Sequence, residues 1–342
     1  METPALTLSP EQEITVKLKR PRFWPAILTL YVLGGLIPEC VATFNTAPRS
    51  FLFNPSSFFF LTAFYGSANL LIRELIRSRP RRLACLLLLG IAFGFVNEGM
   101  IAGTWYTVVP DGYLLLGGID WSWAVALTAF HTIYSIIIPI FLVEALFPTL
   151  ARVPWLRRKG VIGFSVLFLL TTSLTFLLPT YRLERLLVLC AVVILVICAV
   201  RLPLSKHIRS LEPDKLPGLG RLRLAGFVGT LLYFGAILIV PGLLAHTLFP
   251  SYPVLSQILI ILSILITCAF LLRRVRRWTT RSSWRENQAL ALITGALLPT
   301  TLLSLFLPQM WLAAQPAVTL PLMALLLWTA YRRRKANLTI QN

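Results

Sequence analysis

Long apolar runs separated by short polar segments dominate the hydrophobicity pattern of the chain. Crossing a bilayer as an α-helix takes about 20 residues at a rise of about 1.5 Å per residue. Ten runs come close to this length or exceed it. The pattern therefore predicts an all-α, polytopic bundle of about ten transmembrane helices, near residues 23–44, 55–72, 83–103, 121–147, 161–180, 186–202, 224–248, 253–272, 287–307 and 310–331.

The basic residues are distributed unevenly among the segments that connect these runs. All but three of the 32 Lys and Arg residues fall on one side of a ten-span topology, in segments 17–22, 73–82, 152–159, 201–223, 273–285 and 332–335. Lys and Arg favour cytosolic loops. The distribution therefore predicts a multi-pass protein of the plasma membrane, the inner membrane of a bacterium, with both termini in the cytosol. Its parts are cytosolic tails at 1–22 and 332–342 and one membrane domain at 23–331.

The composition agrees with a membrane location. Only 13% of the residues are charged and 57% are hydrophobic, whereas about a quarter of the residues in soluble domains are charged. The net charge is +19, and the basic residues that produce it lie in short segments beside the apolar runs. We therefore expect the lipid bilayer as a partner and no nucleic acid. The cysteines form no Cys-x-x-Cys pair. We therefore expect all five to be buried and to pack as small apolar residues, namely Cys40, Cys85, Cys190, Cys198 and Cys268.

Few ionisable residues lie inside the apolar runs, and Glu98 is the first of them. A charge at this depth costs about 2.5–3.5 kcal/mol even on insertion scales, so it needs a partner, a water-filled cavity or a function. Glycines at spacings of four residues allow a neighbouring helix to approach closely. We therefore expect Glu98 to face protein, because such glycines surround it at Gly90, Gly94, Gly99 and Gly103.

Three further polar residues are predicted near Glu98. Asn97 precedes it, Glu39 follows a proline near the outer end of the first run, and His131 lies about 15 Å into the fourth run. Together they predict an outward-opening cavity whose groups could deprotonate a water, relay protons or bind a cation. The alternative is that packing partners, such as Tyr134, Ser135 or an arginine, simply satisfy each group.

Two other groups of residues are interpreted as structural. At the cytosolic ends of the second and fourth runs, Arg73, Glu74 and Glu144 predict an ion pair that fixes helix packing. The outer loop at 104–120 has no basic residue, and a turn is expected at 110–112. Its aromatic residues predict an interfacial belt, namely Trp105, Tyr106, Tyr113, Trp121 and Trp123.

Three segments carry a resemblance to known proteins: YGSANLLIREL (65–75), LLLLGIAFGFVNEGMIAGTWY (86–106) and LTAFHTIYSIIIPIFLVEALFP (127–148). They resemble a group of uncharacterised bacterial polytopic membrane proteins with a Glu-Glu-Gly segment before a histidine-bearing helix. The order of a carboxylate helix and a histidine helix is also distantly similar to the CAAX-protease and bacteriocin-processing family of intramembrane peptidases. The similarity covers about residues 60–150.

The peptidase resemblance implies a hydrolytic site. The two motif glutamates fall on Asn97 and Glu98, and the motif histidine falls on His131. The chain departs from the family at Ala102 and Leu127, where the motif has arginine and phenylalanine, and it lacks the later histidine motif. A divalent metal such as zinc is a candidate cofactor, although catalytic zinc usually takes three protein ligands.

Three classes of function stay open. The first is an intramembrane hydrolase for a peptide or lipid, with Glu98 as base or ligand and His131 as its partner. The second is a secondary transporter of a small solute, in which Glu98 and Glu39 bind a proton or cation. The third is a non-catalytic membrane scaffold, in which the polar residues only specify helix packing.

Overall fold

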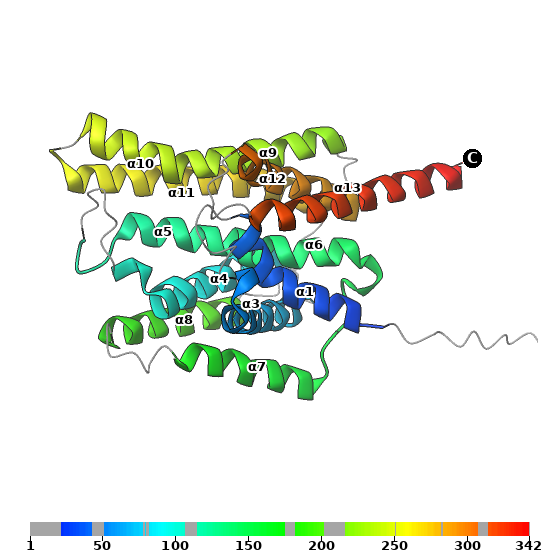
Figure 1. Cartoon of the computed structure of the whole chain (residues 1–342), viewed down its shortest axis with the longest axis horizontal. Helices are drawn as coiled ribbons and strands as arrows, with labels where there is room; N and C mark the ends of the chain where they lie inside the picture. Colours follow the sequence, from blue (N-terminus) through cyan, green and yellow to red (C-terminus); the bar gives the residue numbers. More distant parts are fainter. Residues whose placement is uncertain are drawn as a thin grey trace, which may run out of the picture.

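The computed structural model is a bundle of helices, with one isolated β-bridge and no strand in the residues that it describes (Figure 1). These residues are 22–42, 51–77, 79, 82–106, 115–174, 182–201, 216–249, 251–281, 283–306 and 314–341. A helix lies within each of the ten predicted runs, so the all-α prediction is confirmed for this part of the chain.

Several helices change from α to π geometry along their length. In the first half of the chain the order is α1 (Trp24–Leu36), η2 (Ile37–Val41), α3 (Pro55–Ile76), α4 (Arg82–Gly94), η3 (Phe95–Ala102), η4 (Thr104–Tyr106), α5 (Trp121–Phe130), η5 (His131–Ile137), α6 (Ile138–Leu146) and η6 (Pro148–Leu150). In the second half it is α7 (Arg158–Ser173), α8 (Arg182–Arg201), α9 (Leu219–Phe234), η8 (Gly235–Ile239), α10 (Val240–Gly242), η9 (Leu243–Leu248), α11 (Pro253–Thr279), α12 (Glu286–Phe306) and α13 (Ala314–Gln341). Among these, η2, η3, η5, η8 and η9 are π-helical.

Seven of the described helices are long and apolar enough to cross a membrane. They are Trp24–Val41, Arg82–Ala102, Trp121–Leu146, Leu183–Arg201, Leu219–Ile239, Pro253–Thr279 and Glu286–Leu305. This result supports a multi-pass membrane protein. The other three predicted runs hold α3, α7 and α13, which are not among the seven, so the count of ten stays a prediction.

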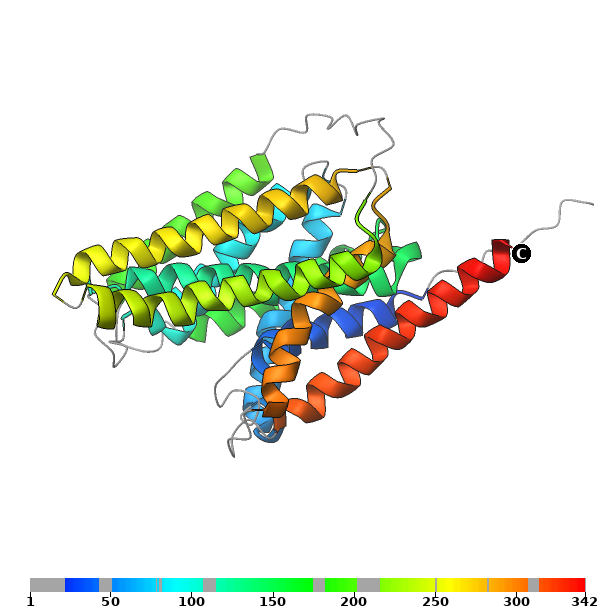
Figure 2. The same ribbon diagram turned by 90° about the horizontal axis from the view of Figure 1, so that it is seen from above.

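The C-terminal helix extends through the predicted tail. Residues 332–342 are predicted as a basic cytosolic tail, and α13 continues through this segment to Gln341. Beyond Pro321 the sequence contains no glycine or proline, and its arginines and lysine are good helix formers. The helix therefore continues past the end of the apolar run. Figure 2 shows α13 running obliquely, with its C-terminal end projecting from the other helices.

Contacts group the connecting segments at two ends of the bundle. Arg79, between α3 and α4, donates to the carbonyl of Val200 near the end of α8 at 2.7 Å. We call the end of the bundle at which Arg79 and Val200 lie the basic end. At the opposite end, the amide of Asp120 donates to the carbonyl of Trp105 at 2.9 Å. The Arg79–Val200 contact brings two of the predicted basic segments together, as the Lys and Arg distribution leads us to expect. The end that faces the cytosol stays a prediction.

The aromatic residues of the predicted belt divide into two groups. Trp121 is exposed, as expected, but Trp105 and Tyr106 are buried. The belt prediction is wrong for these two residues, because the indole of Trp105 packs over Gly99 and the hydroxyl of Tyr106 donates to the Gly99 carbonyl at 2.9 Å. Tyr113 and the predicted turn at 110–112 lie outside the described residues.

The five cysteines are free thiols, but they are not all buried. Cys40 and Cys85 are buried as predicted, and Cys268 is half-buried. Cys190 and Cys198 are exposed. The prediction fails for these two because α8 packs against the bundle with a narrow face and presents most of its apolar side chains outward.

A glycine-mediated crossing joins α9 to α12. A Cβ atom on Gly226 would lie 2.2 Å from the carbonyl oxygen of Leu292, and one on Gly295 would lie 2.0 Å from the carbonyl oxygen of Arg223. Both distances are far below van der Waals contact. The two backbones therefore touch, in the manner of small-residue interfaces between membrane helices.

We predict that Gly226→Ala lowers the thermal stability of the detergent-purified protein. The added methyl group forces α9 and α12 apart, and overpacking of this kind costs about 1–3 kcal/mol. Gly163→Ala in α7 is the matched control, because its Cβ would meet nothing within 4 Å. Equal unfolding midpoints for the two variants would show that the crossing is looser than described.

Candidate functional site

Three helices lose α geometry where they carry the predicted site residues. Glu39 lies in η2, Asn97 and Glu98 lie in η3, and His131 begins η5. A π-turn closes its hydrogen bond five residues apart and often occurs at functional sites. The wider turn changes the direction of the side chains that follow it. All four predicted residues therefore project from irregular segments of otherwise regular helices.

Glu98 and His131 form the centre of the site. Nε2 of the imidazole lies 2.6 Å from Oε1 of the carboxylate, and Nδ1 lies 2.8 Å from Oγ of Ser135. Glu98 is 7% exposed, His131 is 4% exposed and Ser135 is fully buried. The two predicted residues are thus in direct contact, and both ring nitrogens have partners.

Asn97 contacts the pair directly, and Glu39 joins it through Tyr65 and Asn97. Nδ2 of Asn97 lies 3.1 Å from Oε1 of Glu98 and 2.8 Å from Nε2 of His131, and it donates to the hydroxyl of Tyr65 at 3.0 Å. The tyrosine hydroxyl in turn donates to Oε1 of Glu39 at 2.6 Å. All four predicted residues therefore belong to one hydrogen-bonded group, although Glu39 has no direct contact with the central pair among the described bonds.

Thr104 is a further member that the sequence interpretation missed. Its hydroxyl donates to Oε2 of Glu98. Thr104 and Glu39 are half-buried, whereas Tyr65, Asn97 and Glu98 between them are buried. The result is a continuous series of hydrogen bonds with partly exposed ends and a buried middle. We call it the polar chain, and its members in order are Glu39, Tyr65, Asn97, Glu98 and Thr104.

Close packing of two helices brings Glu98 to His131. A Cβ atom on Gly94 would lie 3.0 Å from Cα of Thr128, and one on Gly90 would lie 3.0 Å from Cα of Thr132. The α4–η3 helix therefore lies with its backbone against the α5–η5 helix. This packing confirms the prediction that Glu98 faces protein.

Aromatic rings enclose the imidazole of His131. The ring centroid of Phe130 lies 5.1 Å from it, and those of Phe93 and Tyr65 each lie 6.2 Å from it. These rings keep water away from the pair. Hydrogen bonds in such a low-dielectric environment are stronger than in water, and an unmatched polar group costs more.

Tyr134, a candidate partner of His131, does not join the polar chain. The hydroxyl of Tyr134 lies 3.0 Å from Oγ1 of Thr230 on α9, so it faces another helix. Of the two packing partners named from the sequence, Tyr134 therefore does not bond to the histidine, whereas Ser135 does. His246 lies in η9, but its side chain is outside the described residues.

The described residues offer no ready metal site. No group of three or more His, Cys, Asp or Glu side chains in this part of the chain could hold a metal ion. Glu39 reaches Tyr65, whereas Glu98 and His131 contact each other. The geometry therefore gives no support to the zinc-dependent form of the hydrolase hypothesis.

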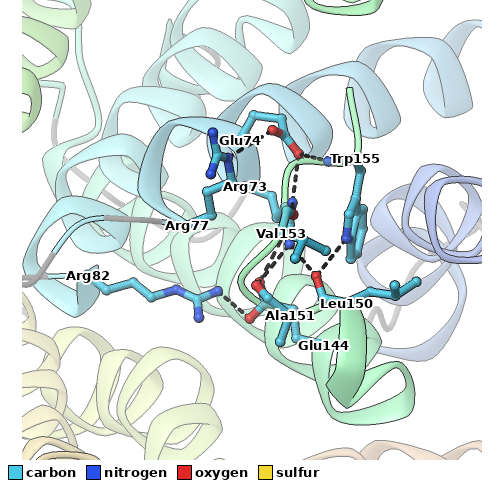
Figure 3. Close-up of polar contacts among 9 residues, drawn as sticks. All are labelled: Arg73, Glu74, Arg77, Arg82, Glu144, Leu150, Ala151, Val153 and Trp155. Atoms are coloured by element: carbon cyan, nitrogen blue, oxygen red, sulfur yellow. Dashed lines mark hydrogen bonds and ion pairs between the residues drawn. The ribbon is translucent and has the colours of Figure 1, made fainter. Parts of the chain in front are cut away.

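A second polar cluster lies at the basic end and is built around Arg73 (Figure 3). The guanidinium is fully buried, and its Cζ atom lies 3.8 Å from the ring centroid of Trp155. Its five N–H groups donate at 2.6–3.4 Å to the carboxylates of Glu74 and Glu144 and to the carbonyls of Leu150, Ala151 and Val153.

The carboxylates of this cluster have additional partners. Glu144 pairs with Arg82 through its second oxygen, and Oε2 of Glu74 lies 3.2 Å from Nε of Arg77. Oε1 of Glu74 also accepts from the amide of Trp155 at 2.9 Å. The predicted ion pair is thus confirmed as part of a larger network, which ties α3 and α4 to α6 and the segment that follows it.

These features define a multi-pass helical membrane protein with a polar chain through its interior. The chain belongs to an uncharacterized membrane protein family, whose family model matches residues 28–333. No curated protein and no solved structure matches the chain. The comparisons therefore give no support to the resemblance to intramembrane peptidases.

We predict that Arg73→Met strongly destabilises the protein, because it removes the buried guanidinium that donates to two carboxylates and three carbonyls. Breaking a buried pair in this way costs about 3–5 kcal/mol. Arg77→Met is the control. The Arg77 side chain is 30% exposed, and among the described ion pairs it pairs with Glu74 alone. Partly exposed ion pairs contribute only about 0–1 kcal/mol to stability. Thermal unfolding in detergent measures both, and equal midpoints would contradict the assignment.

Proposed function

We propose that the protein is a proton-linked secondary transporter of the bacterial plasma membrane, with its basic end in the cytosol. The Glu98–His131 pair would bind and release the proton. The polar chain from Glu39 to Thr104 is the observation that carries this proposal. Ionisable residues inside membrane spans commonly mark ion pathways and proton relays, and here Glu39, Glu98 and His131 belong to one hydrogen-bonded group.

Ser135 supports two protonation states of the pair. When the imidazole is neutral and Nε2–H donates to Glu98, Nδ1 accepts a hydrogen bond from the serine hydroxyl. When the ring is protonated, Nδ1–H donates to the same oxygen, because a hydroxyl can act as donor or acceptor. With Nδ1 and Oγ 2.8 Å apart, His131 can therefore gain or lose a proton and keep both of its hydrogen bonds.

Prolines beside the π-helical segments support a moving site. Pro38 lies within η2, Pro139 lies two residues after η5 ends, and Pro241 separates η8 from η9. Proline removes a backbone donor and weakens the hydrogen-bond ladder near it. Irregular helices of this kind line the binding sites of many transporters.

The face of α3 offers a continuation toward the basic end. Tyr65, Asn69 and Arg73 are spaced four residues apart, so they lie along one side of the helix. Nδ2 of Asn69 donates to the carbonyl of Ser135 at 2.8 Å, and its Oδ1 has no described partner. This polar face extends from the polar chain to the Arg73 cluster, which supports an inner route for the proton.

A hydrolase is the second candidate, and the order Ser135–His131–Glu98 favours it. A hydroxyl, an imidazole and a carboxylate follow one another as in serine hydrolases, with the two ring nitrogens exchanged. We rank it second because Ser135 is fully buried and both oxygens of Glu98 already have protein partners. Proton binding at the Glu98–His131 pair needs only the contacts that exist, whereas hydrolysis also needs a substrate carbonyl beside the nucleophile.

We predict that Glu98→Gln abolishes proton movement in reconstituted vesicles. The assay follows an internal pH-sensitive dye after a membrane potential is imposed, with a panel of small solutes added outside. Glutamine keeps the size of the side chain but cannot release a proton, so the signal should fall to that of protein-free vesicles. Glu286→Gln is the control, because that glutamate is exposed at the start of α12. Wild-type flux in Glu98→Gln would show that Glu98 does not carry the proton, and an absence of flux in the unmodified protein would favour the scaffold hypothesis.

A fluorophosphonate probe separates the two candidate functions. Under the transporter proposal, we expect no covalent labelling of Ser135 in the native protein, because the hydroxyl is enclosed. Mass spectrometry of the digested protein makes the measurement, with Ser135→Ala as the blank. Labelling that is present in the native protein and lost in His131→Ala would instead show an activated nucleophile and favour the hydrolase.

A further inference from the structure

A large apolar groove lies on the other side of the helices that carry Glu98 and His131. Its volume is about 1170 Å³, and its two walls are formed mainly by α4, α5, η5, α6 and α8 on one side and by α9, α11 and α12 on the other. It extends from Trp105 and Trp121 to Arg274 and Trp278 near the basic end. Neither Glu98 nor His131 belongs to its lining.

Two buried polar atoms in this groove have no described partner. They are Nε1 of Trp105, which is 4% exposed, and Oγ1 of Thr128, which is 8% exposed. The indole is held in place between Phe95, 5.0 Å away between ring centroids, and Gly99. A buried donor without a partner costs about 1–3 kcal/mol. An acceptor in the groove that reached these two donors would remove this cost.

The shape and lining of the groove restrict what can fill it. Its volume is at or above the upper end of small-molecule pockets, which measure roughly 300–1,000 Å³. The walls between the two ends are mostly aliphatic and aromatic. A peptide would need partners for every backbone N–H and C=O in such surroundings, whereas a hydrocarbon chain needs none.

The two ends of the groove match the polar parts of a bilayer. Tryptophan lies preferentially where the acyl chains meet the headgroups, with its N–H directed to an oxygen. At the other end Arg274 is exposed, with its Cζ atom 5.4 Å from the ring centroid of Phe270. A molecule with an oxygen acceptor followed by a long apolar chain satisfies the Trp105 end and the walls together.

We propose that the groove binds a phospholipid, with an ester carbonyl at Trp105 and Thr128 and an acyl chain along the apolar walls. The ester oxygen accepts from the indole N–H and from the threonine hydroxyl. The observations behind this site are separate from those behind the transport proposed above, because none of the polar chain residues lines the groove.

Photolabelling tests the location of the lipid. The full-length protein is reconstituted into phosphatidylcholine vesicles that contain a phosphatidylcholine with a diazirine in its acyl chain, and labelled peptides are identified by mass spectrometry. We expect labels on α5, α9 and α11 inside the groove. Ala129→Trp, which fills the groove from a half-buried position on α5, should remove them. Labels on outward faces alone, unchanged by Ala129→Trp, would show surface lipid only and overturn the proposal.

A titration tests the polar contact. Dioleoyl phosphatidylcholine is titrated into the detergent-purified protein, and bound lipid is counted by native mass spectrometry. Thr128→Val and Trp105→Phe each remove one donor, and we expect the affinity to fall about 3- to 10-fold, as for the loss of one hydrogen bond. Thr62→Val is the matched control, because Thr62 is also buried without a described hydroxyl partner but lies outside the groove lining. Equal affinities for all variants, or an equal loss in Thr62→Val, would overturn the proposal.

Discussion

A polar group inside a membrane must find its partners within the protein, and this requirement governs the centre of the bundle. Glu98 and His131 meet at 2.6 Å only because their two helices are in backbone contact. That contact depends on Gly90 and Gly94, where any Cβ atom would press on the facing backbone. The chemistry of the site therefore rests on two positions without side chains, and every other member of the polar chain is placed relative to this pair.

The same requirement is met in a different way at the basic end. All five N–H groups of Arg73 have acceptors, and both of its carboxylate partners have further partners of their own. Such a network loses a bond whenever one member changes its protonation state. The Glu98–His131 pair differs, because the hydroxyl of Ser135 can reverse its hydrogen bond. The Arg73 cluster thus suits a structural role, and the Glu98–His131 pair suits proton exchange. Helix α3 contributes side chains to the cluster and to the polar chain.

The amino-acid pattern predicted the helices and the meeting of Glu98 with His131, because burial inside a membrane allows few polar residues and each of them is informative. It did not predict the π-helical segments, since a wider turn depends on neighbouring helices and leaves the apolar run unchanged. Tyr65 was missed because its ring fits an apolar run and its hydroxyl partners, Asn97 and Glu39, come from two other helices. Thr104 was missed for a similar reason, as an ordinary residue at the start of a loop.

The polar chain and the apolar groove lie on opposite faces of one helix, and this arrangement links them mechanically. His131 faces the chain, whereas its neighbour Thr132, together with Thr128, lines the groove and touches α4. A shift of η5 that separates Glu98 from His131 would also move these threonines and alter the groove wall. A lipid that fits the groove better in one of two such arrangements would stabilise that arrangement by its difference in affinity, and protonation of the pair would alter lipid binding by the same free energy.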